Sequence, residues 1–344
     1  MILVPALITL ATIHCITAES RSKRQDVVCT TPNGEQGNCI HVRSCSALLS
    51  LLKKAPENPE YASFLRKSKC GAYAEVCCPS ADQTVQGCGK TTVSQHNRVV
   101  GGVPADLGAW PWIAALGYRD LYRSNIEWRC GGSLINSRYV LTAAHCVRTP
   151  PSQFLTLAKV RLGEHNLNSD SDGANPVDYD IEKSVVHEDY RSQKNDIALL
   201  RLDKDVVFTD KIRPICLPQP ASLRSSTFDR KYPFVVGWGE TSLEGPSSDI
   251  LLQVQVPVVD NDSCKKAYAK HGAIITESQL CAGEKKGGKD SCRGDSGGPL
   301  MLPQNGSYYQ IGIISFGYKC AEPGYPGVYA RVTSYLDWIK NNME

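Results

Sequence analysis

The sequence lacks an excess of charge of either sign. Lys and Arg number 38, Asp and Glu number 35, and the formal net charge of the 344 residues is +3. A nucleic-acid scaffold or a polybasic membrane binder carries one dominant sign, so we expect no nucleic acid and no charged membrane surface as a partner. After the first 18 residues there is also no long apolar run, so no membrane span is expected.

Metal-binding motifs are missing as well. The chain has no pair of C-x-x-C motifs and no H-E-x-x-H motif, and Cys77 is followed directly by Cys78. Thiolate zinc sites and zinc peptidases use those missing spacings. The chain nevertheless has 15 cysteines, of which 14 remain if Cys15 leaves with a signal peptide. An even number of cysteines in a secreted chain predicts seven disulfides.

Residues 1–18 have the length and composition of a secretory signal peptide. They are apolar and end in small residues near Ala18, and the basic segment 19–28 follows them. The alternative is a buried first strand, but the basic segment has no apolar face that could pack beside it. We therefore expect a secreted, extracellular protein.

The spacing of the cysteines divides the rest of the chain. Six of the 14 lie in residues 29–78, a segment too short to bury much surface, which predicts a disulfide-stapled module. Residues 79–98 show no apolar periodicity and predict an exposed linker. Residues 99–344 contain short β-rich runs, such as the alternating Leu252–Val256, and predict an all-β barrel or sandwich with one helix at Tyr335–Lys340.

The stretch KDSCRGDSGGPL, residues 289–300, contains a candidate nucleophile, Ser296. It fits the G-x-S-x-G nucleophile elbow of the α/β-hydrolases, in which the histidine follows the serine. Here the last histidine is His271, and the alternation of strands with long helices is missing. That fold is excluded, so the base must lie upstream of Ser296.

His145 is the histidine in the most informative context. In LTAAHC it follows an apolar strand end and two small residues that leave room for an imidazole, whereas His165, His187 and His271 lie in polar surroundings. Asp196 opens the apolar run NDIALLRL. An ionised Asp in such a run needs a partner, and a histidine N–H is a fitting one.

The motifs LTAAHC, NDIALLRL and GDSGGP, in this order, resemble those of the chymotrypsin/trypsin-like serine proteases, from Arg98 to the C-terminus. The resemblance implies two six-stranded antiparallel β-barrels with a C-terminal helix and the catalytic residues in the cleft between the barrels. Ser296 would be the nucleophile, His145 the base and Asp196 the orienting acid. The backbone N–H groups of Gly294 and Ser296 would form the oxyanion hole, and no cofactor is required for the chemistry.

The resemblance also implies a specificity pocket and an activation site. Asp290 would lie at the base of the pocket and favour Arg or Lys, with Ser315, Gly317 and Gly327 in the substrate-binding walls. Cleavage after Arg98, in RVVGG, would free Val99 to pair with Asp295 and so convert a zymogen into the enzyme. An upstream trypsin-like protease would make this cut, and a serpin would inhibit the product. Phe316 departs from the Trp that is more common there, which leaves the outer subsites open.

The N-terminal cysteines resemble those of the clip domain of arthropod serine proteases. The resemblance implies the pairs Cys29–Cys77, Cys39–Cys70 and Cys45–Cys78, and in the protease domain Cys130–Cys146, Cys264–Cys281 and Cys292–Cys320. Cys88 is then left to pair with Cys216, which would keep the clip domain attached after cleavage. The clip domain is either a passive spacer or, as we favour, a module that docks on a partner.

Two further features carry weaker signals. The loop 163–173 resembles a calcium loop, in which the side chains of Glu164 and Asp172 and the carbonyls of Asn166 and Ser169 would bind structural Ca²⁺; a solvated acidic loop is the alternative. Asn261 and Asn305 begin N-x-S glycosylation motifs.

The family implies a haemolymph cascade that ends in prophenoloxidase activation, melanization or processing of a Toll ligand. The substrates would be proteins, such as another zymogen or prophenoloxidase. RLGEHNLNSDSDGANPVD also resembles clip proteases of bee venom, so a venom component is the second possibility. The rival from another class is a non-catalytic clip-protease homologue that acts as a binding cofactor. Such homologues usually lack the serine that this chain has.

Overall fold

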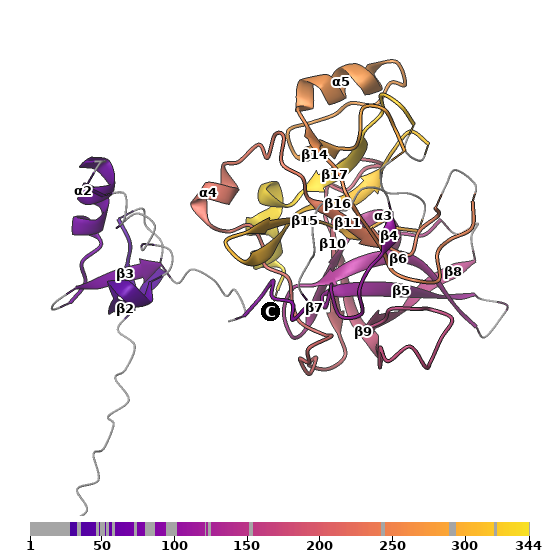
Figure 1. Cartoon of the computed structure of the whole chain (residues 1–344), viewed down its shortest axis with the longest axis horizontal. Helices are drawn as coiled ribbons and strands as arrows, with labels where there is room; N and C mark the ends of the chain where they lie inside the picture. Colours follow the sequence, from indigo (N-terminus) through magenta and orange to yellow (C-terminus); the bar gives the residue numbers. More distant parts are fainter. Residues whose placement is uncertain are drawn as a thin grey trace, which may run out of the picture. The chain divides into compact units, whose positions relative to one another are not determined.

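The computed structural model divides the chain into two compact units, Met1–Ser80 and Ala81–Glu344 (Figure 1). It describes residues 28–32, 36–45, 48, 52, 55–56, 59–71, 74–79, 87–93, 102–120, 122, 125–150, 154–241, 245–288, 294–319 and 322–343. The predicted signal peptide, Arg98, Val99, Asp290 and the Cys292–Cys320 pair lie outside these residues. No helix in the described ranges is long and apolar enough to cross a membrane.

The N-terminal unit is a small sheet with one longer helix. Strands β1 (Val28–Thr30), β2 (Gln36–His41) and β3 (Glu75–Pro79) pair in that order, η1 (Val42–Ser44) follows β2, and α2 (Pro59–Lys67) precedes β3. The disulfides Cys29–Cys77, Cys39–Cys70 and Cys45–Cys78 connect them, as the resemblance implied. The apolar cluster is small and includes Leu48, Leu65 and Val76. The disulfides therefore supply much of the constraint that a larger core would provide.

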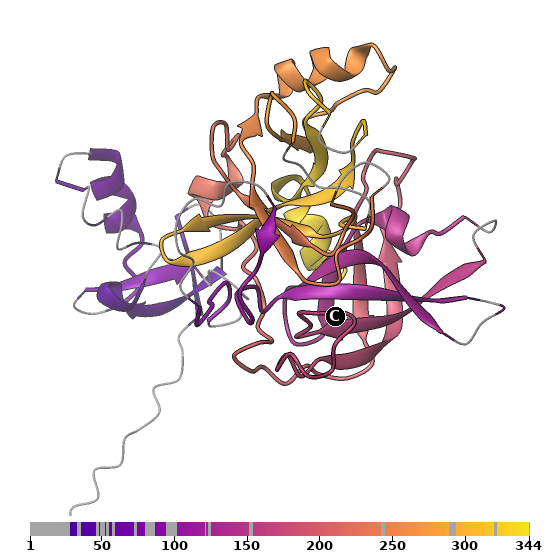
Figure 2. The same cartoon turned by 45° about the vertical axis from the view of Figure 1, so that its right-hand side comes forward.

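The first half of the larger unit is a closed antiparallel barrel, as predicted (Figure 2). Its strands are β5 (Ile113–Asp120), β6 (Ile126–Leu134), β7 (Tyr139–Thr142), β8 (Leu155–Leu162), β9 (Val177–Val186) and β10 (Ala198–Leu202), in the order β10-β7-β6-β5-β8-β9. The short helix α3 (Ala144–Val147) follows β7. Fully buried Leu116, Leu141 and Leu199 lie in its core, which fixes the register of the strands.

The second half is an eight-stranded half-barrel in the order β13-β14-β17-β16-β15-β11-β12-β4. The strands are β4 (Val103–Pro104), β11 (Phe234–Gly237), β12 (Leu252–Gln255), β13 (Val258–Val259), β14 (Gln279–Ala282), β15 (Pro299–Gln304), β16 (Ser307–Phe316) and β17 (Gly327–Arg331). β13 and β4 are the two edge strands of this order. β12 and β13 are consecutive in the chain, with only Val256 and Pro257 between them.

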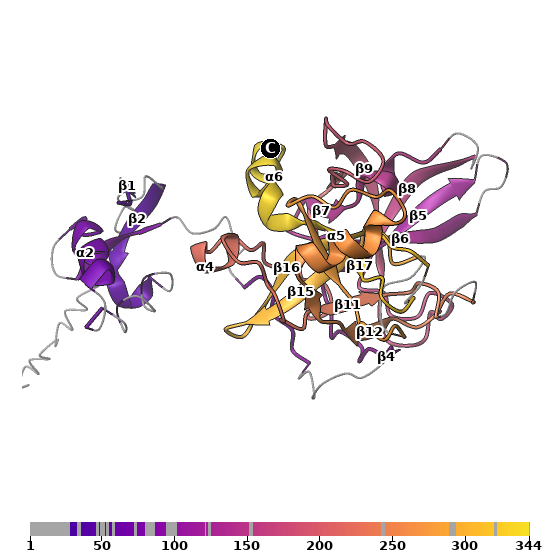
Figure 3. The ribbon, with the colours of Figure 1, turned by 90° about the horizontal axis from the view of Figure 1, so that it is seen from above.

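Helices lie between and after these strands. α4 (Ala221–Arg224) and α5 (Asn261–Ala269) connect strands, and the chain ends in η3 (Val332–Tyr335) and α6 (Leu336–Asn341), the predicted C-terminal helix (Figure 3). One core cluster runs through both halves. Polar bonds cross it as well: Trp110 Nε1 donates to Gln253 Oε1 at 2.7 Å. That bond gives the buried Gln253 side chain a hydrogen-bond partner.

The predicted linker is not fully exposed. Cys88 forms its disulfide with Cys216, and Gly89 N donates to Pro214 O at 2.8 Å. Val93 packs against the core cluster of the larger unit. Residues 87–93 therefore dock on that unit. The composition of the segment did not indicate this, because its few apolar residues, such as Val93, show no periodicity.

Candidate active site

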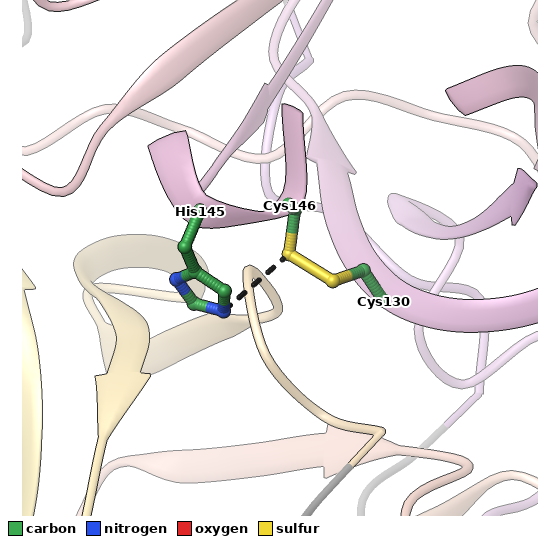
Figure 4. A group of neighbouring side chains, drawn as sticks. All are labelled: Cys130, His145 and Cys146. Carbon is green, nitrogen blue, oxygen red and sulfur yellow. Dashed lines mark hydrogen bonds between the residues drawn. A yellow bond between two sulfur atoms is a disulfide. The ribbon is translucent and has the colours of Figure 1, made fainter. Parts of the chain in front are cut away.

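His145 lies in α3, directly after the barrel strand β7. Ala143 and Ala144 are buried, and Cys146 forms the expected disulfide with Cys130. Figure 4 shows the imidazole beside this disulfide, with Nε2 3.7 Å from Cys146 Sγ. Both sulfurs are in the disulfide, so this group offers no thiolate to a metal. The disulfide instead forms a wall that limits where the ring can lie.

Asp196 is the buried partner that the sequence predicted for His145. Its carboxylate is 3% exposed and accepts bonds from His145 Nδ1 at 2.8 Å and from the His145 backbone N–H at 3.0 Å. Ser315 Oγ donates a third bond, at 2.6 Å. These donors offset the cost of burying the charge. Since Nδ1 carries the donated proton, Nε2 keeps the lone pair that a general base needs.

Ser296 lies in the loop that leads into β15. Its carbonyl accepts a bond from Gly131 N on β6 at 2.8 Å and lies 3.4 Å from Cys146 Sγ. His145 Nε2 and the Ser296 backbone therefore contact the same sulfur. The fold thus brings the backbone of the candidate nucleophile and the ring of the candidate base to one disulfide, although the sequence places them in two separate motifs.

The two glycines around Ser296 have conformations that need glycine. Gly294 has φ +96° and Gly297 has φ +79°. A Cβ on Gly297 would lie 2.3 Å from Thr142 Oγ1 and 2.6 Å from Gly131 O. The loop can approach the barrel this closely only without a side chain at this position.

The Asp295 side chain has a different partner from that of Asp196. Its Oδ1 accepts a bond from Gly239 N at 2.8 Å, and a Cβ on Gly237 would lie 2.1 Å from the same oxygen. Asp295 is thus packed against the end of β11, while Asp196 holds the imidazole. Its predicted partner, Val99, lies outside the described residues.

The predicted specificity pocket is described only in part. Gly317 follows β16 and Gly327 begins β17, and the nearest atom to a Cβ built on Gly317 is Lys319 O at 3.6 Å. The Ser315 hydroxyl donates to Asp196, while the contact of Ser315 with substrate stays a prediction. The bond to Asp196 was missed because no sequence pattern indicates which way the side chain points. Asp290 lies outside the described residues.

A cavity that the sequence did not predict borders Gly294. Its volume is about 390 Å³, and its walls include Trp128, Trp238 and Leu167 with the polar Arg129 and Asp249. Arg161 lies over the Trp128 ring, 4.4 Å from its centroid, and bonds to Asp178 and Glu164. The cavity is therefore adjacent to Gly294 of the candidate oxyanion hole.

The predicted calcium loop already has protein donors on both carboxylates. Glu164 is 8% exposed and accepts bonds from Arg161 at 3.2 Å and from His165 N at 2.7 Å. Asp172 accepts bonds from Asn166 N and Ala174 N, and Lys211 Nζ donates to Gly173 O. A calcium ion would have to displace Arg161 from Glu164, so calcium stays a prediction on which no step of the mechanism depends.

The two glycosylation motifs differ in their surroundings. Asn261 Nδ2 donates to Thr276 O and Gln279 O, and Arg331 bonds to its Oδ1. Asn305 is exposed in the turn between β15 and β16. A glycan on Nδ2 of Asn261 would break bonds that a glycan on Asn305 would leave intact.

One buried and one half-buried tyrosine lie near His145 and Asp196. Tyr118 Oη donates to Cys146 O at 2.7 Å, and burial raises the pKa of Tyr118. Burial, with a smaller contribution from the negative charge of Asp196, raises the pKa of Tyr190. Both tyrosine hydroxyls therefore stay protonated at neutral pH.

Comparison with known proteins agrees with this geometry. Residues 99–339 match the trypsin family, and residues 29–78 match the regulatory clip domain of proteinases. A venom serine protease of Bombus ignitus is 49% identical over 90% of each chain. The proclotting enzyme of Tachypleus tridentatus is 39% identical over 97% of this chain and 96% of its own length. Phenoloxidase-activating factor 1 of Holotrichia diomphalia is 39% identical over 92% and 93% of the two chains.

Proposed function

Since the chain belongs to the trypsin family of serine endopeptidases and carries an N-terminal clip domain, we propose that it is a secreted zymogen. Cleavage after Arg98 produces an endopeptidase that cuts proteins after Arg or Lys. One observation carries this proposal. The buried Asp196 carboxylate lies 2.8 Å from His145 Nδ1, and His145 Nε2 lies near the same Cys146 sulfur as the Ser296 backbone carbonyl.

In the proposed mechanism Ser296 Oγ attacks the scissile carbonyl carbon while His145 Nε2 takes its proton. The new C–O bond gives a tetrahedral oxyanion, which collapses as His145 returns the proton to the leaving amine. The C–N bond breaks in this collapse and leaves an ester on Ser296 Oγ. Water then attacks the ester carbon while His145 takes its proton, and the return of that proton to Ser296 Oγ breaks the ester C–O bond and releases the carboxylic acid. Asp196 holds the imidazole tautomer and stabilises the imidazolium at both steps.

The backbone N–H groups of Gly294 and Ser296 stabilise the oxyanion. The left-handed backbone of Gly294 supports this assignment, because two amides can converge on one oxygen only where the loop turns sharply. One such donor contributes on the order of 3 kcal/mol to the transition state.

Specificity for Arg or Lys rests on Asp290, whose charge would stay unpaired against an apolar substrate side chain. Gly317 and Gly327 leave room for a long basic residue. The cavity beside Gly294 would take a residue on the leaving side of the scissile bond.

Activation rests on Asp295. Its carboxylate, held by Gly239 N, is the proposed partner of the Val99 ammonium that cleavage creates. That ion pair orders the loop carrying Gly294 and Ser296. The activator is another trypsin-like protease, and a serpin is the expected inhibitor.

The relatives described above support a physiological role in a cascade or a venom. Their names include a proclotting enzyme, a phenoloxidase-activating factor and a venom protease. We therefore propose a protein substrate in haemolymph, such as another zymogen or prophenoloxidase, or activity as a venom component. Of the two glycosylation motifs, we propose that Asn305 carries the glycan.

The test is hydrolysis of matched Arg, Lys and Phe peptide amides before and after cleavage at Arg98. The proposal predicts activity only after cleavage, on Arg and Lys but not Phe, and none in Ser296→Ala. Cleaved, folded wild type that is inert on all three amides would contradict it and favour a non-catalytic binding cofactor.

A further inference from the structure

The C-terminal end of the chain contacts the segment that carries Asp196. Tyr335, in η3, is 4% exposed, and its Oη donates to Asn195 Oδ1 at 3.0 Å. Asn195 is the residue directly before Asp196. Tyr335 therefore hydrogen bonds to the residue that precedes Asp196, whose carboxylate binds His145 Nδ1.

Asn195 has a backbone conformation that needs support. Its φ is +53°, in the left-handed region that residues other than glycine adopt only occasionally. Its Nδ2 donates to Asp189 O at 3.0 Å, and its carbonyl accepts a bond from Ile197 N at 2.9 Å. The side chain of Asn195 thus closes a turn from which Asp196 emerges, and Tyr335 holds the other end of that side chain.

A second contact fixes the start of the same segment. Trp338, in α6, stacks on His187 with centroids 5.2 Å apart, and its Nε1 donates to Glu188 Oε2 at 2.9 Å. The Tyr335 ring meets His187 edge-on at 5.6 Å. Residues 187–196 are therefore held at both ends by η3 and α6, and removal of one hydroxyl from Tyr335 leaves the ring contacts in place.

We infer that Tyr335 is a positioning residue for the catalytic carboxylate, acting through Asn195. The inference rests on the proposed function, because it assigns no role to Tyr335 unless Asp196 orients His145. Its bond selects the turn in which Asp196 points both oxygens at the His145 donors. Without that bond, Asp196 samples orientations in which it stabilises the imidazolium less.

Ionisable groups surround this network on the segment itself and on the elements packed against it. Asp196 faces His145 and Ser315, and its charge also acts on Tyr190 and Tyr335. Glu188, Asp189, Arg191 and Lys194 lie on the segment beside His187, and Arg148 lies over the Tyr190 ring. Ser278 also hydrogen bonds to the Tyr335 hydroxyl. That contact must be separated from the one to Asn195.

The test is Tyr335→Phe in the full chain, cleaved after Arg98 and assayed on an Arg peptide amide. We expect kcat to fall roughly tenfold, since small misplacements of catalytic groups are costly, while KM changes by less than about twofold. The acid limb of the pH–kcat profile should move to lower pH, because the protonated imidazole has lost stabilisation. A purely structural role would lower thermal stability without moving that limb.

Two variants control for the loss of a buried hydroxyl. Tyr179→Phe removes one from β9, where the side chain is 4% exposed, and Ser278→Ala removes the other partner of Tyr335. Both should keep the wild-type kcat and pH profile. Asn195→Gly tolerates the left-handed backbone but lacks both side-chain bonds, so it should match Tyr335→Phe or exceed it. The double variant Tyr335→Phe/Asn195→Gly should lose no more kcat than Asn195→Gly alone.

The outcomes separate the two claims. An inert wild type overturns the proposed function and this inference with it. An active wild type with an unchanged profile in Tyr335→Phe, or with fully additive losses in the double variant, overturns the inference alone. If Tyr335→Phe does not fold, Asn195→Gly gives the same readout, and an unmoved acid limb there overturns the inference.

Discussion

The closed barrel and the half-barrel supply the active site in different ways. The barrel provides His145 and Asp196 from segments next to paired strands, and three hydrogen bonds fix the Asp196 carboxylate. The half-barrel provides Ser296 from a loop whose two positive-φ glycines let it approach the barrel. The candidate base thus lies on helix α3 and its candidate acid in a turn just before β10, while the candidate nucleophile lies in a loop shaped by two glycines. A zymogen would be expected to regulate the loop.

The largest loss of kcat should come from a substitution at Asp196, which the closed barrel provides. Asp196→Asn keeps the shape of the side chain but places an amide against His145 Nδ1, which favours the wrong tautomer. In the Ser-His-Asp template of this family the same change costs about 10⁴-fold in kcat. We expect a comparable loss at neutral pH, measured on an Arg peptide amide with cleaved protein. A loss below tenfold would show that Asp196 is not the orienting acid.

On the loop side, Gly297→Ala should cost less than Asp196→Asn. The new Cβ meets Thr142 Oγ1 and Gly131 O, so the loop must move away from the barrel and displace the proposed oxyanion donors. We expect kcat to fall by roughly 10²–10³-fold, the usual cost of losing one such donor.

Gly272→Ala is the matched control for Gly297→Ala. Gly272 has φ +69°, but no atom lies within 4 Å of its added Cβ, so it reports the backbone strain without the collision. It should lose some thermal stability and keep full activity. Equal activity of the two variants would contradict the claim that the close approach of the loop to the barrel matters.

The smallest loss of kcat should follow removal of the Ser315–Asp196 hydrogen bond, which joins the half-barrel to the closed barrel. Ser315→Ala removes one of three donors to Asp196, while both His145 bonds remain. Hydrogen bonds to charged groups contribute about 1.5–3 kcal/mol, so we expect kcat to fall by roughly tenfold.

Ser133→Ala controls for the loss of a buried hydroxyl between the halves, since Ser133 Oγ bonds to Gln310 at 2.5 Å, away from Asp196. It should destabilise the protein and leave kcat unchanged. If Ser315→Ala also leaves kcat unchanged, the hydrogen bond from the half-barrel does not contribute to the role of Asp196.

The sequence predicted the parts of the site that local pattern encodes. A carboxylate at the start of an apolar strand needs a partner, so the motifs alone were enough to match Asp196 with His145. The family resemblance supplied the role of Ser296 and the cysteine pairs, six of which the structure forms.

Contacts between distant segments could not be predicted in this way. The Ser315 hydroxyl on Asp196, the Tyr335 bond to Asn195 and the burial of Gln253 against Trp110 each join residues far apart in the chain. Periodicity indicates which face of a strand is buried, but it does not indicate the polar partner on the other side. The docked Val93 was missed for the same reason.

The proposed mechanism requires that Ser296 becomes a nucleophile when the chain is cleaved after Arg98. This can be measured by treating intact and cleaved protein with a serine-reactive fluorophosphonate and mapping the adduct by peptide mass spectrometry. We expect rapid, stoichiometric modification of Ser296 in the cleaved protein, little in the intact protein, and none when His145 is replaced by Ala. Equal labelling before and after cleavage, or an adduct on another residue, would contradict that mechanism.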